Sequence, residues 1–339
     1  MAAEKQLVCT KHTSIPLEDA IYAALALSPD GKFVWISGAD DRMVRCWDLE
    51  TQALAYEWIA TVIDDRPAHQ GLVTDVHRIA SLALDYEHSI LITGGWEIHA
   101  WNIITKKKIK SFKGGGWGDE MFISPDGSEL FTLNRVNGKI TCWDITSGKK
   151  KYQVKGESPS PMILTPDGNS LIVLEHEMSK VQRKRVRDLK LNLRSTRDGI
   201  ITRHFESDKI THGFNGLTIS SNGELVAGGG VNGFHIWNFS GGKHLHHVNK
   251  KSHPNLAKHL DITYMIQFIP TTDLLMEAGS DGAIVIWDAI SGQPVASMKG
   301  EKNFTRLSAL NLDGSSLVTV CMGDNGAQSI EVWKLAFQV

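Results

Sequence analysis

The sequence concentrates its charged chemistry in one stretch. Residues 180–197, KVQRKRVRDLKLNLRSTR, hold eight Lys or Arg side chains and a single acid, Asp188. Such a density suits an acidic protein surface or the phosphates of a nucleic acid. The alternative is a solvated hairpin whose charges protect an exposed strand edge. The candidate contact residues are four of its bases, Arg183, Lys184, Arg185 and Arg187.

Two other bases of this stretch, Lys190 and Arg194, are expected to be ordinary strand positions that face outward. No aromatic residue interleaves the bases, which counts against single-stranded RNA as the ligand, because RNA bases stack on aromatic rings. A nucleic-acid role for residues 180–190 therefore stays open only as an alternative to a protein partner.

Trp96 and Trp117 are the candidate anchors for a protein partner. Each is flanked by glycines, in the segments TGGWE and GGGWG. A Trp held at a surface by a short loop is a typical interface anchor. The alternative is that each fills a gap over its sheet, where a Trp buries a large area.

Groups that could catalyse a reaction or hold a cofactor show no recognised spacing. The histidines at 244, 246, 247 and 253 lack the Cys or carboxylate partners of a zinc site. Glycine runs at 114–116 and 228–230 lack the Lys-Ser/Thr of a phosphate-binding loop, and no G-x-S-x-G turn occurs. The sequence therefore predicts no catalytic residue, no cofactor, no metal and no small-molecule substrate.

The elements that must position these residues are strands, because the chain repeats a strand-rich unit. In most units a Trp followed by Asp or Asn ends the third strand, at intervals of 54, 42, 94, 50 and 46 residues. The interval of 94 is two periods of 47, so one copy has lost its Trp and has Arg194 in that place. The chain thus contains seven units. Their six Trp residues are Trp47, Trp101, Trp143, Trp237, Trp287 and Trp333.

A second marker sets the register of the units. Pro-Asp-Gly turns or their relatives separate the first and second strands, and Gly and Asp suit such tight turns. Alternating apolar residues on both sides of the turns favour strands over helices. The turns lie at 29–31, 125–127, 166–168, 221–223 and 312–314.

The period, the turns and the Trp-Asp pairs together resemble the WD-repeat family over nearly the whole chain. The resemblance implies an all-β, seven-bladed β-propeller of four-stranded antiparallel blades. In the family a His, an Asp, a Trp and a Ser or Thr form a hydrogen-bonded set that pins each blade. The matching positions are His259, Asp281 and Trp287 in the sixth unit, Ser37, Asp41 and Trp47 in the first, and Trp143 in the third; Glu277 replaces the Ser or Thr of the sixth.

The resemblance also implies how the ring closes. The last unit has three strands of its own, and in the family an N-terminal strand often completes the final blade. Residues 6–11 are well placed for this, the alternative being a frayed N-terminus. We expect a single domain, residues 1–339. Its blades are expected at about 23–58, 78–113, 119–155, 160–207, 213–249, 262–300 and 304–339 plus 6–11.

The irregular segments are expected on one face of such a propeller. Connectors between blades and turns between second and third strands emerge together on that face, here called the top. Loops that vary on a rigid scaffold usually carry the binding sites. The segments concerned are 60–77, Trp96, Trp117, 178–190 and 243–261.

Composition places the chain among ordinary soluble globular proteins, with 42% hydrophobic residues, 22% charged residues and a net charge of −2. There is no global basic bias, no run long enough to span a membrane and no apolar signal core at the start. The four cysteines are isolated in the sequence, which indicates free thiols in a reducing compartment. We therefore expect a cytoplasmic protein, or a nuclear one if the cell has a nucleus.

The sequence as a whole favours a non-catalytic scaffold or adaptor subunit that holds a protein partner on its top face, by analogy with WD-repeat proteins. One alternative is a nucleic-acid-associated subunit that uses residues 180–190. The other is an enzyme in which polar groups such as Asp119, Asp261 or Arg306 converge at the mouth of the central channel.

Overall fold

The computed structural model describes most of the 339-residue chain. Within that part every helix or strand assigned is a β-strand, and no helix is long and apolar enough to cross a membrane. The described residues are 6–17, 22–38, 42–60, 79–113, 118–181, 184–206, 210–231, 233–249, 263–279, 283–299, 307–322 and 326–338.

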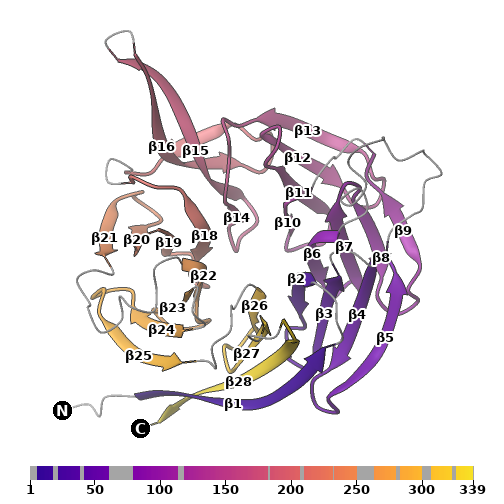
Figure 1. The fold of residues 1–339 in the computed structure, drawn as a ribbon. Coiled ribbons are helices and arrows are strands. Elements are labelled where there is room, and N and C mark those ends of the chain that lie inside the picture. Colours follow the sequence, from indigo (N-terminus) through magenta and orange to yellow (C-terminus); the bar gives the residue numbers. More distant parts are fainter. Residues whose placement is uncertain are drawn as a thin grey trace. The chain divides into compact units, whose positions relative to one another are not determined.

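The strands form seven four-stranded antiparallel sheets (Figure 1). The chain divides into two compact units, a smaller unit of residues 18–156 and a larger unit of residues 1–17 and 157–339. Six sheets consist of four consecutive strands, and the seventh combines β1 with β26, β27 and β28. The expectation of a single domain stays a prediction.

The smaller unit contains three sheets, which are β2 (Tyr22–Leu27), β3 (Phe33–Gly38), β4 (Met43–Asp48) and β5 (Ala53–Ile59); β6 (Ile79–Asp85), β7 (Ile90–Gly95), β8 (His99–Asn102) and β9 (Lys108–Ser111); and β10 (Glu120–Ile123), β11 (Glu129–Asn134), β12 (Lys139–Asp144) and β13 (Lys150–Lys155).

The larger unit contains four sheets, which are β14 (Met162–Leu164), β15 (Ser170–Val181), β16 (Lys184–Ser195) and β17 (Ile201–His204); β18 (Phe214–Ile219), β19 (Leu225–Gly230), β20 (Gly233–Asn238) and β21 (His244–Asn249); β22 (Thr263–Phe268), β23 (Leu274–Gly279), β24 (Ala283–Asp288) and β25 (Pro294–Lys299); and β26 (Leu307–Leu310), β27 (Ser316–Met322), β28 (Gln328–Gln338) and β1 (Gln6–Leu17).

The N-terminal strand β1 completes the last sheet. It pairs antiparallel with β28 over residues 6–17 and 328–338, a longer strand than the sequence predicted. Lys11 Nζ lies 2.7 Å from Glu331 Oε1, and the Glu331 side chain is only 4% exposed. The predicted fold class, an all-β chain of seven four-stranded antiparallel blades with the N-terminal strand in the last one, is confirmed.

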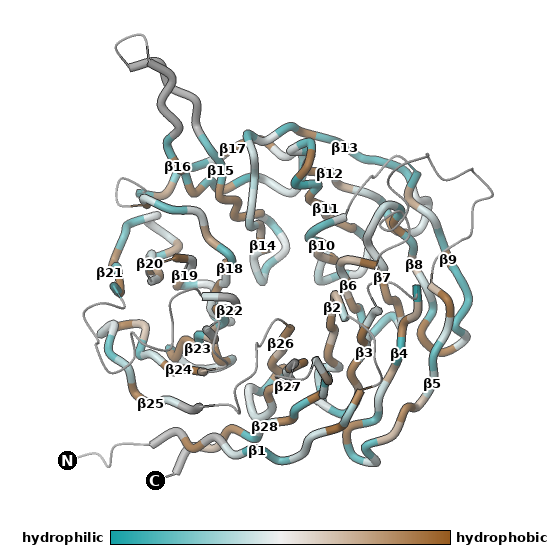
Figure 2. The backbone as a smooth tube through the Cα atoms, viewed as in Figure 1, coloured by the Kyte–Doolittle hydropathy of each residue, from teal (hydrophilic) through white to brown (hydrophobic). Residues whose placement is uncertain are grey.

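The second and third strands of each sheet supply most of the core. In β11 all but the first residue is buried, whereas the fourth strand β13 has no buried residue. Figure 2 shows the same contrast, with β9 coloured mainly hydrophilic. The fourth strand is an edge of its sheet, where more of its side chains meet solvent, and it is therefore more polar.

One side chain occupies an equivalent pairing position in every third strand. The fourth strand carries one extra residue directly opposite this place, so the pairing register shifts there in all seven sheets. Arg194 occupies it in the fourth blade, as the sequence predicted. The pairs across the second and third strands are Val34↔Trp47, Leu91↔Trp101, Leu130↔Trp143, Leu171↔Arg194, Val226↔Trp237, Leu275↔Trp287 and Leu317↔Trp333.

The predicted tight turns all have the same backbone conformation. Their glycines have φ between +69° and +73°, a left-handed region that other residues rarely adopt. In four of the five, a Ser or Thr hydroxyl donates to the turn Asp or Asn, as Ser124 does to Asp126 at 2.5 Å. These glycines are Gly31, Gly127, Gly168, Gly223 and Gly314.

Candidate interaction site

Trp96 lies in the turn that joins β7 to β8 in the smaller unit, and its side chain is 47% exposed. The turn is short, because β7 ends at Gly95 and His99 already pairs with Thr93. Trp101 in β8 donates its indole N–H to Thr93 Oγ1 at 3.0 Å, which ties the two strands together. Trp96 is therefore a large side chain carried on an anchored turn.

Glycines bring the segment that follows Trp117 beside this turn. Gly118 donates its N–H to the carbonyl of Gly95 at 3.1 Å. A Cβ on Gly94 would lie 2.8 Å from the Gly118 carbonyl oxygen, so a side chain there would prevent the approach. Trp117 itself lies outside the described residues, and its neighbour in sequence is held next to the Trp96 turn.

The extra residues of the fourth blade lengthen two strands. β15 and β16 pair without interruption from Ser170↔Ser195 to Val181↔Lys184. β14 and β17 pair only with the base of this hairpin, and Figure 1 shows it extending past both of them. We call residues 177–188 the basic hairpin.

The register assigns places to the predicted contact residues of the basic hairpin. Arg185 pairs with Lys180, and Arg187 with Met178. Opposite residues of a ladder, and residues two apart along a strand, share a face. Lys180, Arg185 and Arg187 therefore have register positions on one face and Lys184 on the other, while Arg183 lies outside the described residues.

Arg194 anchors the base of the hairpin, and the expectation that it faces outward is wrong. Its side chain is 8% exposed and forms a two-pronged ion pair with Glu175, at 2.8 and 3.0 Å. Its third nitrogen donates to the Gly199 carbonyl at 2.7 Å, and Asn192 donates to Glu175 at 2.7 Å. A Trp occupies the same register position in the other blades, and a charged Arg buried there needs a carboxylate partner.

Some of the repeated Trp side chains donate to an acceptor on the second strand, as Trp101 does to Thr93. Trp143 donates to Thr132 Oγ1 at 3.1 Å. In the sixth blade Trp287 donates to Glu277 Oε2 at 3.1 Å, and Thr263 donates to the other oxygen of Glu277. The acid in the Ser/Thr place therefore keeps the bond to the Trp and adds one to the first strand.

The hydrogen-bonded set expected in the first blade requires a correction. Ser37 donates to the Ile79 carbonyl at 3.4 Å rather than binding Trp47. The buried indole nitrogen of Trp47 has no hydrogen-bond partner among the described residues. Ser37 is therefore a contact to the neighbouring strand β6.

The register explains why equal spacing misled the prediction. Ser37 precedes Trp47 by ten residues, as Glu277 precedes Trp287. In the first blade, however, Trp47 pairs with Val34, which is three residues before Ser37. In the sixth blade Trp287 pairs with Leu275, which is only two residues before Glu277. Because strand side chains alternate, this one-residue difference turns Ser37 to the opposite face.

Several predicted residues cannot be placed. Asp41, His259 and Asp281 of the expected pinning sets lie outside the described residues, as do Asp261 and Arg306 of the enzyme alternative. Asp119, the remaining residue of that alternative, is described, and its carboxylate accepts the backbone N–H of residue 135 at 2.7 Å.

Three of the four cysteines have described side chains, and all three are buried free thiols. Burial raises the pKa of Cys46 and of Cys142 to about 12. A thiol must lose its proton to act as a nucleophile or a metal ligand. Among the described residues, no group of three or more His, Cys, Asp or Glu side chains could hold a metal ion.

Residues 7–48 match the family model of the WD domain, G-beta repeat. This stretch is similar to a WD repeat. It runs through β1, which belongs to the last sheet, and through β2, β3 and β4 of the first. With the seven four-stranded blades, the match confirms the resemblance to the WD-repeat family. No curated protein matches the chain.

Sequence reasoning missed the groups that hold these side chains in place. The acceptors Thr132 and Thr93 each lie two residues after the second-strand residue that pairs with the Trp. This relation can be recognised only when the strand register is known. Glu175 has no such signal, because its distance from Arg194 follows from an unusually long hairpin. The run 228–230 has a packing role: a Cβ on Gly228 would lie 2.5 Å from the Phe214 ring.

Proposed function

We propose that the chain is a non-catalytic scaffold that binds another protein, with the Trp96 turn as one contact. WD repeats generally mediate protein–protein interaction, which supports the proposal. The observation that carries it is the 47% exposure of Trp96 on a turn anchored by Trp101 and Gly118. A Trp supplies a large contact area at a low cost in side-chain entropy, and Trp is common at interface hot spots.

The basic hairpin is proposed as a second contact, for an acidic segment of a protein partner. It projects past β14 and β17, so no described strand of that sheet pairs with its two edges. Three bases with register positions on one face would place like charges together, which favours an acidic partner. The Trp96 turn and the basic hairpin belong to different units and are proposed separately.

The Trp96 contact is tested by affinity capture from the source cell with wild type and Trp96→Ala. We expect loss of specific proteins, with an affinity reduced about 30-fold for a hot-spot Trp worth about 2 kcal/mol. Ile104→Ala is the matched control, because Ile104 is 68% exposed and lies in the β8–β9 turn of the same sheet. Equal capture by wild type and Trp96→Ala, with unchanged melting curves, would refute this contact.

The basic hairpin is tested with Arg183, Lys184, Arg185 and Arg187 all changed to Ala. Lys107→Ala with Lys108→Ala is the control for the loss of exposed positive charge elsewhere. We expect capture of an acidic protein to fall and the nuclease-treated sample to behave as the untreated one. A signal removed by nuclease, with a steep salt dependence, would instead establish the nucleic-acid alternative.

A further inference from the structure

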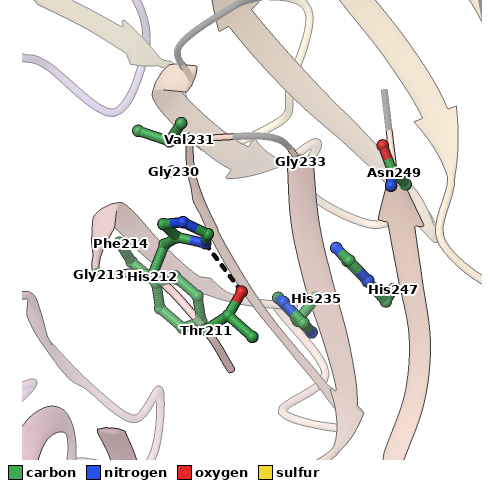
Figure 3. A pocket seen from close by; sticks show the side chains of 10 residues that line it. All are labelled: Thr211, His212, Gly213, Phe214, Gly230, Val231, Gly233, His235, His247 and Asn249. Atoms are coloured by element: carbon green, nitrogen blue, oxygen red, sulfur yellow. Dashed lines mark hydrogen bonds between the residues drawn. The ribbon is translucent and has the colours of Figure 1, made fainter. Parts of the chain in front are cut away.

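A hollow lies at one end of the β18–β21 sheet, within the larger unit. Figure 3 shows its walls, which come from the segment before β18, the ends of β19 and β21 and the start of β20. Its volume is about 170 Å³, which is less than the several hundred Å³ of a drug-sized ligand site and suits only a small group. We call it the histidine pocket.

Glycines keep the histidine pocket open. A Cβ on Gly230 would overlap the carbonyl oxygen of Gly213, and one on Gly233 would overlap that of Val248. Backbone segments therefore meet here with no side chain between them. Nothing lies within 4 Å of the place where a Cβ on Gly213 would be, so no neighbouring side chain reaches into that part of the space.

Three imidazoles from three separate segments line the pocket. His212 precedes β18, His235 lies in β20 and is 6% exposed, and His247 lies in β21. The rings of His235 and His247 are parallel, with centroids 4.2 Å apart, and Figure 3 shows His212 across the space from them. A neutral imidazole carries one ring N–H, which can donate a hydrogen bond.

The charge of the surroundings decides between an anion and a cation. None of the described residues that line the pocket is Asp or Glu. Glu206 lies outside the lining, and its carboxylate accepts the backbone N–H of His244 at 3.1 Å. The His244 ring in turn has its Nε2 3.0 Å from His235 Nδ1. An imidazole N–H can donate to a negative oxygen, and a hydrogen bond to a charged group is stronger than one between neutral groups.

We propose that the histidine pocket binds an oxyanion group, either a phosphate or a carboxylate. The imidazole N–H groups of His212, His235 and His247 would donate to its oxygens, with the Asn249 amide at the rim. The group could belong to a free small anion or to a side chain of a bound protein. The proposal stands on the pocket alone and does not depend on the Trp96 contact.

The test follows the imidazole Cε1–H signals of histidine-labelled protein by NMR, during titration with inorganic phosphate and, separately, acetate. We expect saturable shifts of His212, His235 and His247. His247→Leu should weaken binding about tenfold or more, because leucine has no N–H and one hydrogen bond to a charged group is lost. His246→Leu is the matched control, because His246 directly precedes His247 in β21 and its ring bonds the Ile290 carbonyl at 2.6 Å instead.

Gly213→Val provides a second variant that fills the space and leaves every histidine in place, and it should abolish the shifts. Tighter binding of the tripeptide Gly-phosphoserine-Gly than of phosphate would assign the site to a partner's side chain. Tighter binding of phosphate would assign it to a free anion. Shifts that do not saturate, that persist unchanged in both folded variants, or that only Zn²⁺ produces would overturn the proposal.

Discussion

The buried pair of Arg194 and Glu175 allows the sharpest test of how this chain tolerates the loss of a blade Trp. Changing Glu175 to Met removes two bonds from the guanidinium and one from Asn192, and leaves Arg194 only its bond to the Gly199 carbonyl. With the Arg194 side chain 8% exposed, water cannot replace the lost partner.

The magnitude follows from that burial. Removing one member of a buried ion pair costs about 3–5 kcal/mol, because the other charge stays desolvated and unpaired. Arg194→Met should cost a similar amount by stranding Glu175, whose side chain is 4% exposed. Replacing both by Met removes both charges together, and such exchanges are often neutral or stabilising. The double variant should therefore be more stable than either single one.

The assay is urea denaturation followed by tryptophan fluorescence, with wild type, both single variants and the double variant. The expected double-mutant cycle has a coupling free energy of about 3 kcal/mol or more, in the sense that the two losses are far from additive. Additive losses, or single variants as stable as wild type, would show that the pair is hydrated in solution and that the argument from burial is wrong.

Three further predictions concern stability. Removing residues 1–17 deletes β1 and exposes β28 as a sheet edge, so the melting temperature should fall and aggregation should rise with concentration. Gly228→Ala should cost about 1–3 kcal/mol by denaturation, because its Cβ would lie 2.5 Å from the Phe214 ring. Asp126→Asn should lower stability at neutral pH but not in strong acid. The bond from the Ser124 hydroxyl is the main cause that lowers the pKa of Asp126 to about 2 in the folded state, against about 3.9 when unfolded, so its stabilisation is full above pH 4 and lost as pH falls towards 2.

Each of these has a contrary outcome. A truncated chain that melts as the full one does would show that β1 is dispensable. Gly213→Ala serves as control for Gly228→Ala, since nothing lies within 4 Å of its Cβ position; equal losses would contradict the steric argument. For Asp126, a difference from wild type that persists unchanged at about pH 2 would contradict the titration.

How far the candidate site could be predicted depended on how local its determinants were. Trp96 could be singled out because the short turn around it is written in consecutive residues. Arg194 could be placed in the Trp position by counting, but its burial and its partner could not, because Glu175 is 19 residues away and reaches it only through the register of β15 with β16. The histidine pocket draws on His212, His235 and His247, which no spacing rule groups.

The sequence by itself determined the number of blades, the turns and the composition of each sheet. These depend on consecutive strands joined by short hairpins, and a glycine with positive φ, such as Gly127, acts within a few residues of itself. The tertiary structure alone decided which side chains meet. Ser37 and Glu277 have the same spacing from their Trp residues. Glu277 lies on the same face of its sheet as Trp287, whereas Ser37 lies on the face opposite to Trp47, because a shift of one residue in the pairing register reverses which face a strand side chain occupies.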